Sequence, residues 1–153
     1  MAVKQYKPTN PASRDRSVST FEELTTSKPH KPLAQGKKRI GGRNNKGQTT
    51  IRFRGGGHKR RYRVVDFKRD KHGVPGRVAT VEYDPNRTAH IAQLSYSDGD
   101  KRYILWPNGL VVGAEVISGE DAPVKLGSAL PIRQIAGGPG GHHRARERGR
   151  GGQ

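Results

Sequence analysis

The sequence predicts a mainly β protein, in which a long, extended, basic arm leads into a small antiparallel barrel that is followed by an irregular tail. Three observations support this fold class. Only 30% of the 153 residues are hydrophobic and 6% aromatic, with 21 Gly and 10 Pro, so the core must be small. From residue 62 onward, short runs of strand length follow one another without helical periodicity. The net charge is +17, and the excess lies outside those runs.

The arm comprises residues 1–58. Four prolines in its first 35 residues interrupt regular structure, so most of it is expected to be extended. Within residues 19–24, Ser or Thr with Glu three positions later resembles a capping box and predicts one or two helical turns. Residues 48–54 alternate in character and predict a short strand. After these prolines, glycines stand at positions 41, 42, 47 and 55–57. They indicate positive φ or close approach of the backbone to a partner.

The barrel comprises residues 59–135. Turn sequences separate most of its strands, and Asp98-Gly99 is the clearest hairpin signal. A barrel is preferred to a sandwich because so few apolar residues serve one closed sheet better than two stacked ones. From Gly76 to Ile135 six bases face seven acids, so this unit is nearly neutral. The runs of strand length are 62–68, 77–83, 89–96, 101–106, 114–117 and 130–135.

The tail, residues 136–153, has no periodicity and almost no apolar content, which predicts disorder. Its adjacent His142 and His143 could bind a metal ion. No other ligand-type pattern accompanies them, so a solvated tail is the preferred interpretation.

Several function classes are disfavoured. The chain has no Cys for a disulfide or a thiolate metal site, and no apolar run long enough for a secretion signal or a membrane span, which makes the cytoplasm the expected compartment. His58, His72 and His90 lie outside any recognisable nucleophile motif. A phosphate-binding loop would need Gly-Lys followed by Ser or Thr, which is missing. We therefore expect no enzyme activity, cofactor, metal or small-molecule substrate.

The strongest functional signal is the basic segment Gly36–Arg63. Between Leu24 and Val65 the chain has thirteen bases and no acid, a density that a polyanion would neutralise with release of counterions. Arg can bind phosphate through two donors, Lys supplies a point charge, Asn can bond to bases, and Gly lets backbone N–H groups approach phosphates. The aromatic rings and His58 could stack on unpaired bases or could equally be packing. The predicted contacts are Lys37, Lys38, Arg39, Arg43, Asn44, Asn45, Lys46, Arg52, Arg54, Gly55, Gly56, Gly57, His58, Lys59, Arg60, Arg61, Tyr62, Arg63, Lys68 and Arg69.

Folded RNA is the preferred partner over DNA. No recognition-helix pattern is visible, whereas irregular Gly/Arg-rich arms on a small barrel suit the shape of a folded RNA. A general single-stranded nucleic-acid-binding or RNA-chaperone module is the alternative. It would show aromatic stacking and tolerance of any strand.

Specific motifs then suggest a family. GGRNNKG at 41–47, RGGGHKRRYR at 54–63 and EYDPNR at 82–87 resemble the bacterial members of the universal L-two family of large-subunit ribosomal proteins. The resemblance runs from the first residues to about Ile135. It implies an OB-fold-like barrel with a long N-terminal extension, both bound to large-subunit ribosomal RNA on the cytoplasmic ribosome. It also implies contacts with other ribosomal proteins, subunit association and support of the peptidyl-transferase region.

The sequence departs from the family pattern in three places. The family continues into a second, SH3-like domain, whereas this sequence ends at Gln153, so no role of that domain is carried over. From Ala136 the pattern is lost, through a truncated or shifted reading frame or through genuine divergence. Trp106 occupies a position where the family suggests a small residue, so that strand end is expected to pack differently.

Overall fold

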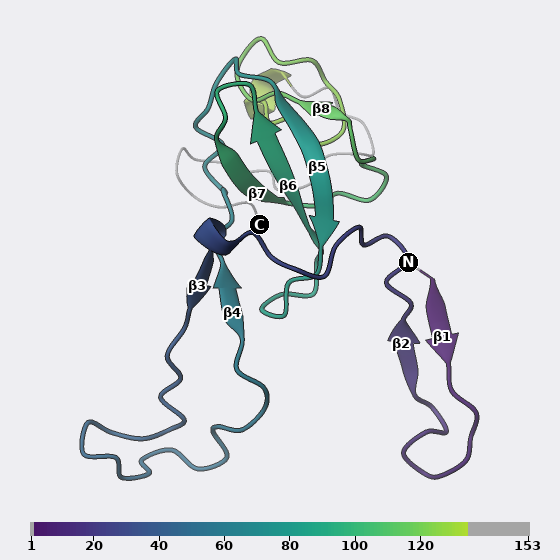
Figure 1. Cartoon of the computed structure of the whole chain (residues 1–153), viewed down its shortest axis with the longest axis vertical. Coiled ribbons are helices and arrows are strands. Elements are labelled where there is room, and N and C mark those ends of the chain that lie inside the picture. Colours follow the sequence, from purple (N-terminus) through teal and green to yellow (C-terminus); the bar gives the residue numbers. More distant parts are fainter. Residues whose placement is uncertain (1, 135–153) are drawn as a thin grey trace.

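The computed structural model describes residues 2–134 and confirms a mainly β protein (Figure 1). A curled antiparallel sheet forms the body, and two thin ribbons extend from it. Helical structure in the described residues is limited to two 3-10 turns, η1 (Lys31–Leu33) and η2 (Ile132–Gln134). The predicted disorder of the tail and its histidine pair lie outside the described residues. No helix within residues 2–134 is long and apolar enough to cross a membrane.

The body is a four-stranded sheet in the order β7 (Lys101–Leu105), β6 (Ile91–Tyr96), β5 (Gly76–Glu82) and β8 (Glu115–Val116). All pairs are antiparallel. The hairpin between β6 and β7 closes at the predicted Asp98-Gly99 turn, where Gly99 has φ 85°. A register shift between Val78 and Thr80 marks a β-bulge, and bulges increase local twist. The curled half-barrel agrees with the expected OB-fold-like architecture.

Side chains cover both faces of this sheet because alternate residues of a strand point to opposite sides. The main cluster lies on one face, and Trp106 packs against it while Nε1 donates to the Leu110 carbonyl at 2.8 Å. On the other face Val65, Ile91 and Tyr103 form a second cluster, joined by Leu33. Residues from the base of the arm therefore complete the core. The main cluster is Val78, Ala92, Leu94, Tyr96, Ile104, Leu110 and Val116.

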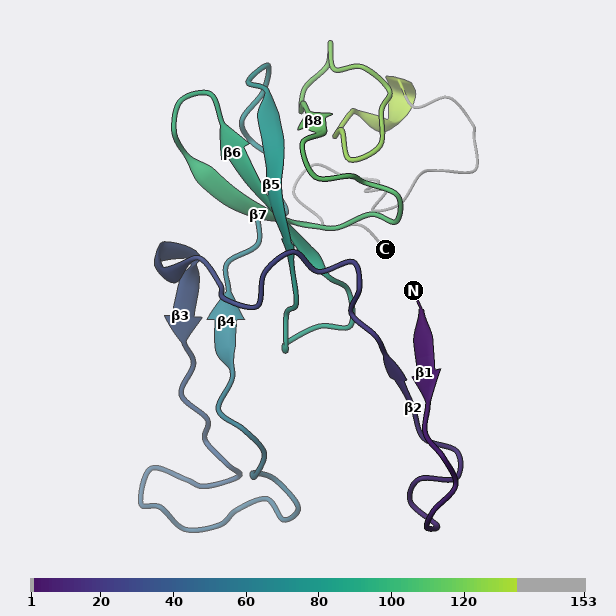
Figure 2. The ribbon, with the colours of Figure 1, turned by 45° about the vertical axis from the view of Figure 1, so that its right-hand side comes forward.

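The arm forms two ribbons rather than a single extended chain. β1 (Val3–Gln5) pairs with β2 (Ser17–Ser19), and β3 (Ala34–Gly36) pairs with β4 (Arg61–Arg63) (Figures 1 and 2). The segment between β2 and η1 runs along the body, where Thr25 N donates to the Val81 carbonyl at 3.0 Å. This segment lies beside β5, with Thr26 in a parallel bridge to Glu82, and connects the two ribbons.

Two predicted elements of the arm are wrong. Residues 19–24 form no helical turns because Ser19 pairs with Val3 in the β1–β2 hairpin and Phe21 has φ 56°, which a helix cannot accommodate. Residues 48–54 form no strand, since only Thr49 makes an isolated bridge, with Arg43, and Phe53 has φ 60°. The capping signal of the first segment and the alternation of the second were therefore outweighed by the backbone partners that lie within reach.

Two predicted barrel strands also differ. The run 62–68 is shortened to β4, which pairs with β3 outside the central sheet, and beyond it Val65 makes a single parallel bridge to Tyr103. The described part of the run 130–135, residues 130–134, is not a strand, because η2 occupies it: Gln134 N donates to the Pro131 carbonyl at 3.0 Å. Pro131 lacks the N–H that a paired strand needs.

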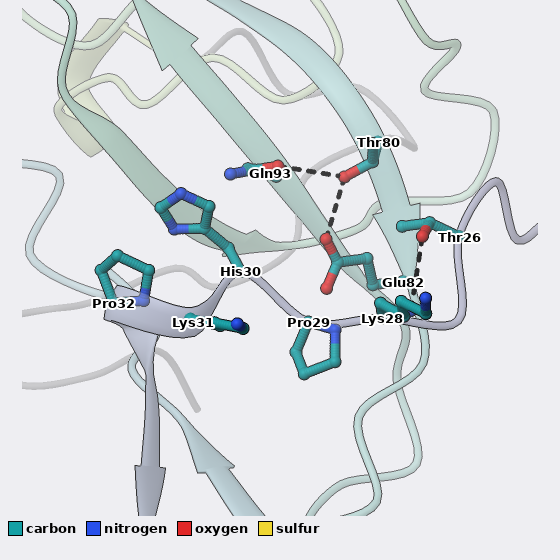
Figure 3. Close-up of a pocket in the computed structure, with 9 residues that line it drawn as sticks. All are labelled: Thr26, Lys28, Pro29, His30, Lys31, Pro32, Thr80, Glu82 and Gln93. Atoms are coloured by element: carbon teal, nitrogen blue, oxygen red, sulfur yellow. Dashed lines mark hydrogen bonds between the residues drawn. The ribbon is translucent and has the colours of Figure 1, made fainter.

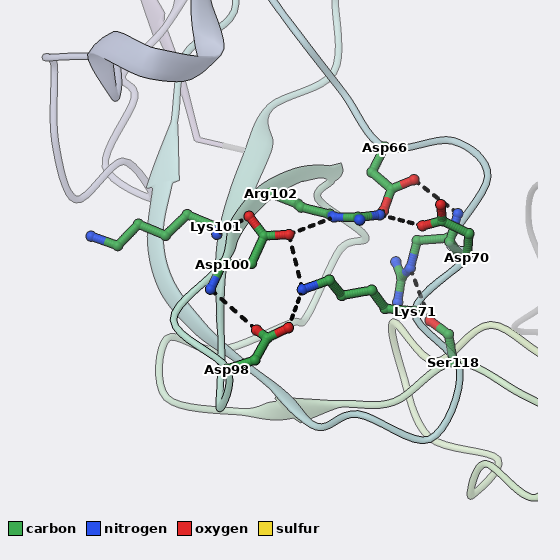
Figure 4. A network of polar contacts seen from close by, with 9 residues as sticks. Asp66, Asp70, Lys71, Asp98, Asp100, Lys101, Arg102 and Ser118 are labelled. Atoms are coloured by element: carbon green, nitrogen blue, oxygen red, sulfur yellow. Dashed lines mark hydrogen bonds and ion pairs between the residues drawn. The ribbon is translucent and has the colours of Figure 1, made fainter.

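A network of ion pairs closes one end of the sheet (Figure 4). Arg102 Nη1 donates to Asp66 at 2.8 Å and also to Asp70, while Arg102 Nε donates to Asp100 at 3.1 Å. Lys71 binds Asp100 at 2.9 Å and also Asp98 in the hairpin turn. The hydrogen bond from Arg102 is the largest cause that lowers the pKa of Asp70. At this end of the sheet, the charges of Lys71 and Arg102 are thus matched by carboxylates of the body.

Candidate nucleic-acid interface

The basic loop, defined here as residues 37–60, connects β3 to β4 and projects away from the sheet (Figures 1 and 2). None of its residues is buried. The β3–β4 ribbon, which connects this loop to the body, is fixed at the body by Asn86, whose Nδ2 donates to the Arg61 carbonyl at 2.8 Å. The basic loop is therefore carried on a short stalk with a defined attachment point.

The attachment depends on the turn that follows β5. Asp84 is fully buried and accepts hydrogen bonds from Arg87 Nε at 2.6 Å and from Asn86 N at 2.8 Å. Asp84 Oδ1, which accepts from Asn86 N, also accepts from Asn86 Nδ2 at 2.8 Å. This bond orients the Asn86 amide toward β4. Sequence analysis predicted turns between most of the strands and missed the anchoring role of this Asp-Pro-Asn segment. An Asp before Pro-Asn was the available signal, since Asp commonly bonds to the backbone two residues later.

Hydrogen bonds inside the basic loop give it a shape of its own. Asn44 Oδ1 accepts from the backbone N–H of Lys46 at 3.0 Å and of Gln48 at 2.9 Å, which makes a local turn. Arg39 Nη1 donates to the Gly56 carbonyl at 2.6 Å and links the two sides of the loop. The predicted contact residue Asn44 thus uses its oxygen within the loop, whereas Asn45 is exposed.

Glycines allow this loop to turn and to pack tightly, as predicted. Gly42 has φ 72°, and a Cβ there would lie 2.4 Å from the Ile51 carbonyl oxygen and 2.9 Å from Arg54 Cβ. Only a residue without a side chain fits this crossing of two backbone segments. The run Gly55–Gly57 also has positive φ throughout, at 121°, 73° and 73°. L-residues rarely adopt these values.

The cations of this segment are not neutralised by the protein. Within residues 2–134, none of the eleven bases from Lys37 to Arg63 forms an ion pair. In the body, by contrast, Lys71, Arg87 and Arg102 are all paired with carboxylates. The loop therefore concentrates unmatched positive charge on a protruding surface, which is the electrostatic footprint of a nucleic-acid-binding protein.

Exposed apolar side chains accompany these charges. Phe53 is 95% exposed and Ile40 is 74% exposed, and Ile51 is also exposed. The Arg52 guanidinium lies 5.4 Å from the centre of the Phe53 ring, and the Lys37 ammonium lies 5.8 Å from that of Tyr62. Sequence analysis did not assign Ile40 or Ile51 to the interface. The signal that could have found them is their isolation in a basic, glycine-rich segment. Such a segment has no core of its own in which these side chains could be buried.

Five of the predicted contact residues lie outside the basic loop: Arg61 and Tyr62 stand next to it in β4, and three others lie farther away. Arg63 is buried, and its Nη1 donates to the Arg61 carbonyl at 2.7 Å. Arg69 bonds to Ser118 Oγ at 3.1 Å and to the Gly127 carbonyl at 3.0 Å, and burial lowers its pKa. Lys68 is exposed, on the segment that precedes these bonds. The structure thus brings together the predicted residues from Lys37 to Tyr62, while Arg63 and Arg69 hold the fold together.

A sequence profile described as "Ribosomal Proteins L2, RNA binding N-terminal domain" matches residues 30–118, more than half of the chain. The chain belongs to the ribosomal protein L2 family. The L2 match begins at the residue before η1, includes the entire basic loop and ends two residues after β8. It therefore places both the protruding cations and the curled sheet inside the family's RNA-binding domain. Binding of ribosomal RNA follows from this membership.

Proposed function

We propose that this chain binds large-subunit ribosomal RNA of the bacterial type mainly through the basic loop, with residues 59–134 as the folded unit that positions it. The observation that carries the proposal is the protruding loop, whose cations have no carboxylate partner among the described residues. A phosphate backbone supplies the missing negative charge, and release of its counterions drives binding. The exposed Phe53 ring and the half-buried Tyr62 ring are suited to stack on unpaired bases.

The division into an arm of residues 1–58, a barrel of residues 59–135 and a tail of residues 136–153 is part of this proposal. We further propose that the chain is a structural component of cytoplasmic ribosomes and has no catalytic activity. Its other partners there are neighbouring ribosomal proteins and the small subunit. Membership of the L2 family supports a role in subunit association and in the surroundings of the peptidyl-transferase region.

Neutralising three adjacent bases tests the proposed interface. In the variant Lys59→Gln, Arg60→Gln, Arg61→Gln, affinity for a large-subunit RNA fragment should fall. The plot of log affinity against log salt should lose about 2–3 units of slope, since each phosphate contact contributes about 0.7–0.9. The Asn86 bond is kept because it uses the Arg61 backbone carbonyl.

The matched control removes three exposed bases of the body, Arg77, Lys101 and Lys125, which changes the net charge by the same amount. The control should reduce the slope much less. An equal loss of slope in both variants would mean that total charge, and not the basic loop, sets affinity.

A general single-stranded nucleic-acid-binding or chaperone module remains the second candidate, favoured by the exposed Phe53 ring. Competition separates the two. A structured large-subunit RNA fragment should displace a generic single strand of equal length at much lower concentration if the first function is right. Equal displacement supports the second.

A further inference from the structure

A pocket of about 490 Å³ lies between the base of the arm and the central sheet, beside the start of the β3–β4 ribbon (Figure 3). One wall is the arm segment that includes Lys28, Pro29 and His30, and the other is β5 and β6 with Thr80 and Gln93. None of the contacts predicted from the sequence lies in this pocket. Its size suits one small planar group rather than a peptide.

The pocket contains polar groups that the fold leaves without partners. Gln93 is only 7% exposed, and its Nε2 has no hydrogen-bond partner among the described residues. Thr80 Oγ1 lies 3.3 Å from Gln93 Oε1 and 3.0 Å from Glu82 Oε1. The hydroxyl has a single proton, and the Glu82 carboxylate can only accept it. Whichever way the Gln93 amide is oriented, one half of it is therefore left for a ligand.

A second buried group shares this property. His30 Nδ1 is buried and has no partner in the described part of the chain, while the His30 backbone N–H donates to Tyr103 Oη at 2.8 Å. That backbone bond fixes where the imidazole ring enters the pocket. An amide and an imidazole nitrogen can each donate or accept one hydrogen bond, which matches the mixed donor and acceptor edge of a nucleobase.

The remaining lining also fits a nucleotide. Pro29 and Pro32 present flat apolar rings, and the exposed Lys28 and Lys31 form no ion pair within residues 2–134. The carboxylate of Glu82 is 3% exposed and is hydrogen-bonded to Thr80 and Tyr103, and the ammonium groups of Lys28 and Lys31 would offset its repulsion of a phosphate. The pocket thus combines apolar faces and a hydrogen-bonding floor with unmatched cations.

We infer that this pocket binds one unstacked nucleotide of the RNA held by the basic loop, with its base against Gln93 and His30 and its phosphate near Lys28 or Lys31. The inference rests on the proposed function for the origin of the nucleotide. η1 leads directly into β3, so an RNA that extends from the loop along the β3–β4 ribbon toward the body reaches the pocket opening. Proteins that recognise RNA sequence commonly take up such extruded bases.

Base-specific chemical probing of a bound large-subunit RNA fragment tests this inference. The full chain should protect the base-pairing edge of one unpaired nucleotide, and Gln93→Met should restore its reactivity. Affinity should fall about three- to tenfold, the effect of one lost hydrogen bond, with an unchanged salt slope because no phosphate contact is removed. Ser95→Ala, on the same face of β6 but outside the pocket, serves as the control and should leave the protection intact.

A measurement on the unaltered chain guards against misfolding of the variant. Addition of each 5′-nucleoside monophosphate should shift the NMR signal of the Gln93 side-chain amide, with one base preferred. If the chain binds the RNA but protects no unpaired base, or if Gln93→Met keeps the protection, the pocket inference is overturned while the proposed function stands. Mononucleotide binding without any protected RNA base overturns the assignment to RNA. If the chain does not bind ribosomal RNA at all, but a nucleoside monophosphate still shifts the NMR signal of the Gln93 side-chain amide, the proposed function is overturned.

Discussion

Removing one hydroxyl, in Tyr103→Phe, should weaken the attachment of the arm to the body. Tyr103 is fully buried; its hydroxyl donates to Glu82 Oε2 at 2.7 Å and accepts from the His30 backbone N–H at 2.8 Å. Burial, together with the bond to Glu82, raises the pKa of Tyr103, so the hydroxyl stays protonated at neutral pH. Phe keeps the ring in the second core cluster and removes both bonds.

The expected loss can be worked out from these contacts. The substitution leaves a backbone donor and a carboxylate oxygen without partners, at about 1–3 kcal/mol each. The free energy of unfolding should therefore fall by about 2–6 kcal/mol, a large part of the 5–15 kcal/mol typical of a domain. Urea denaturation followed by circular dichroism measures this loss as a midpoint lowered by about 1–3 M.

Tyr96→Phe provides the matched control. Tyr96 is 6% exposed and packs in the main cluster, and no hydrogen bond of its hydroxyl to another residue is found within the described part of the chain. Its loss should cost less than about 0.5 kcal/mol. Equal midpoints for the two variants would refute the argument that Tyr103 fastens the arm through its hydroxyl.

Three further predictions concern the basic loop and the charges of the body. Gly42→Ala should weaken RNA binding without changing the melting temperature of the body, because its Cβ would collide within the loop. Gly36→Ala, where nothing lies within 4 Å of the added Cβ, should change neither the RNA affinity nor the melting temperature. Equal RNA affinities for the two variants would contradict this prediction. Asp84→Asn should lower the free energy of unfolding by about 2–4 kcal/mol in urea, since a buried acceptor of three hydrogen bonds becomes partly a donor; a loss below about 1 kcal/mol would contradict it. The bond from Arg102 lowers the pKa of Asp70 below 3.8, so its contribution to stability is complete above pH 3.8 and is lost as pH falls through the lowered value. Arg102→Gln should therefore flatten the decline of unfolding free energy between about pH 4 and 2 at low salt, and parallel curves for variant and wild type would show that the pair is unimportant.

The sequence by itself determined the features that depend on local chemistry and on composition. The β6–β7 hairpin was predicted because Asp98-Gly99 favours a tight turn whatever surrounds it. The contrast between a nearly neutral body and a strongly basic segment is a property of the residue list. Positive φ in the run Gly55–Gly57 was likewise indicated by residue type. Together with the family motifs, these signals were sufficient for the fold class and for the L2 family.

Only the tertiary structure decided how distant segments pair. Strand length and residue type assigned residues 62–68 to the barrel, yet β4 pairs with β3 across the whole basic loop, because strand pairing depends on which partner lies within reach. The bond from His30 to Tyr103 joins residues 73 positions apart, and no pattern in either neighbourhood indicates it. The pocket around Gln93 exists because that bond holds the arm against the sheet. Residue types determined which groups could bind RNA, and long-range packing determined which of them remained free to do so.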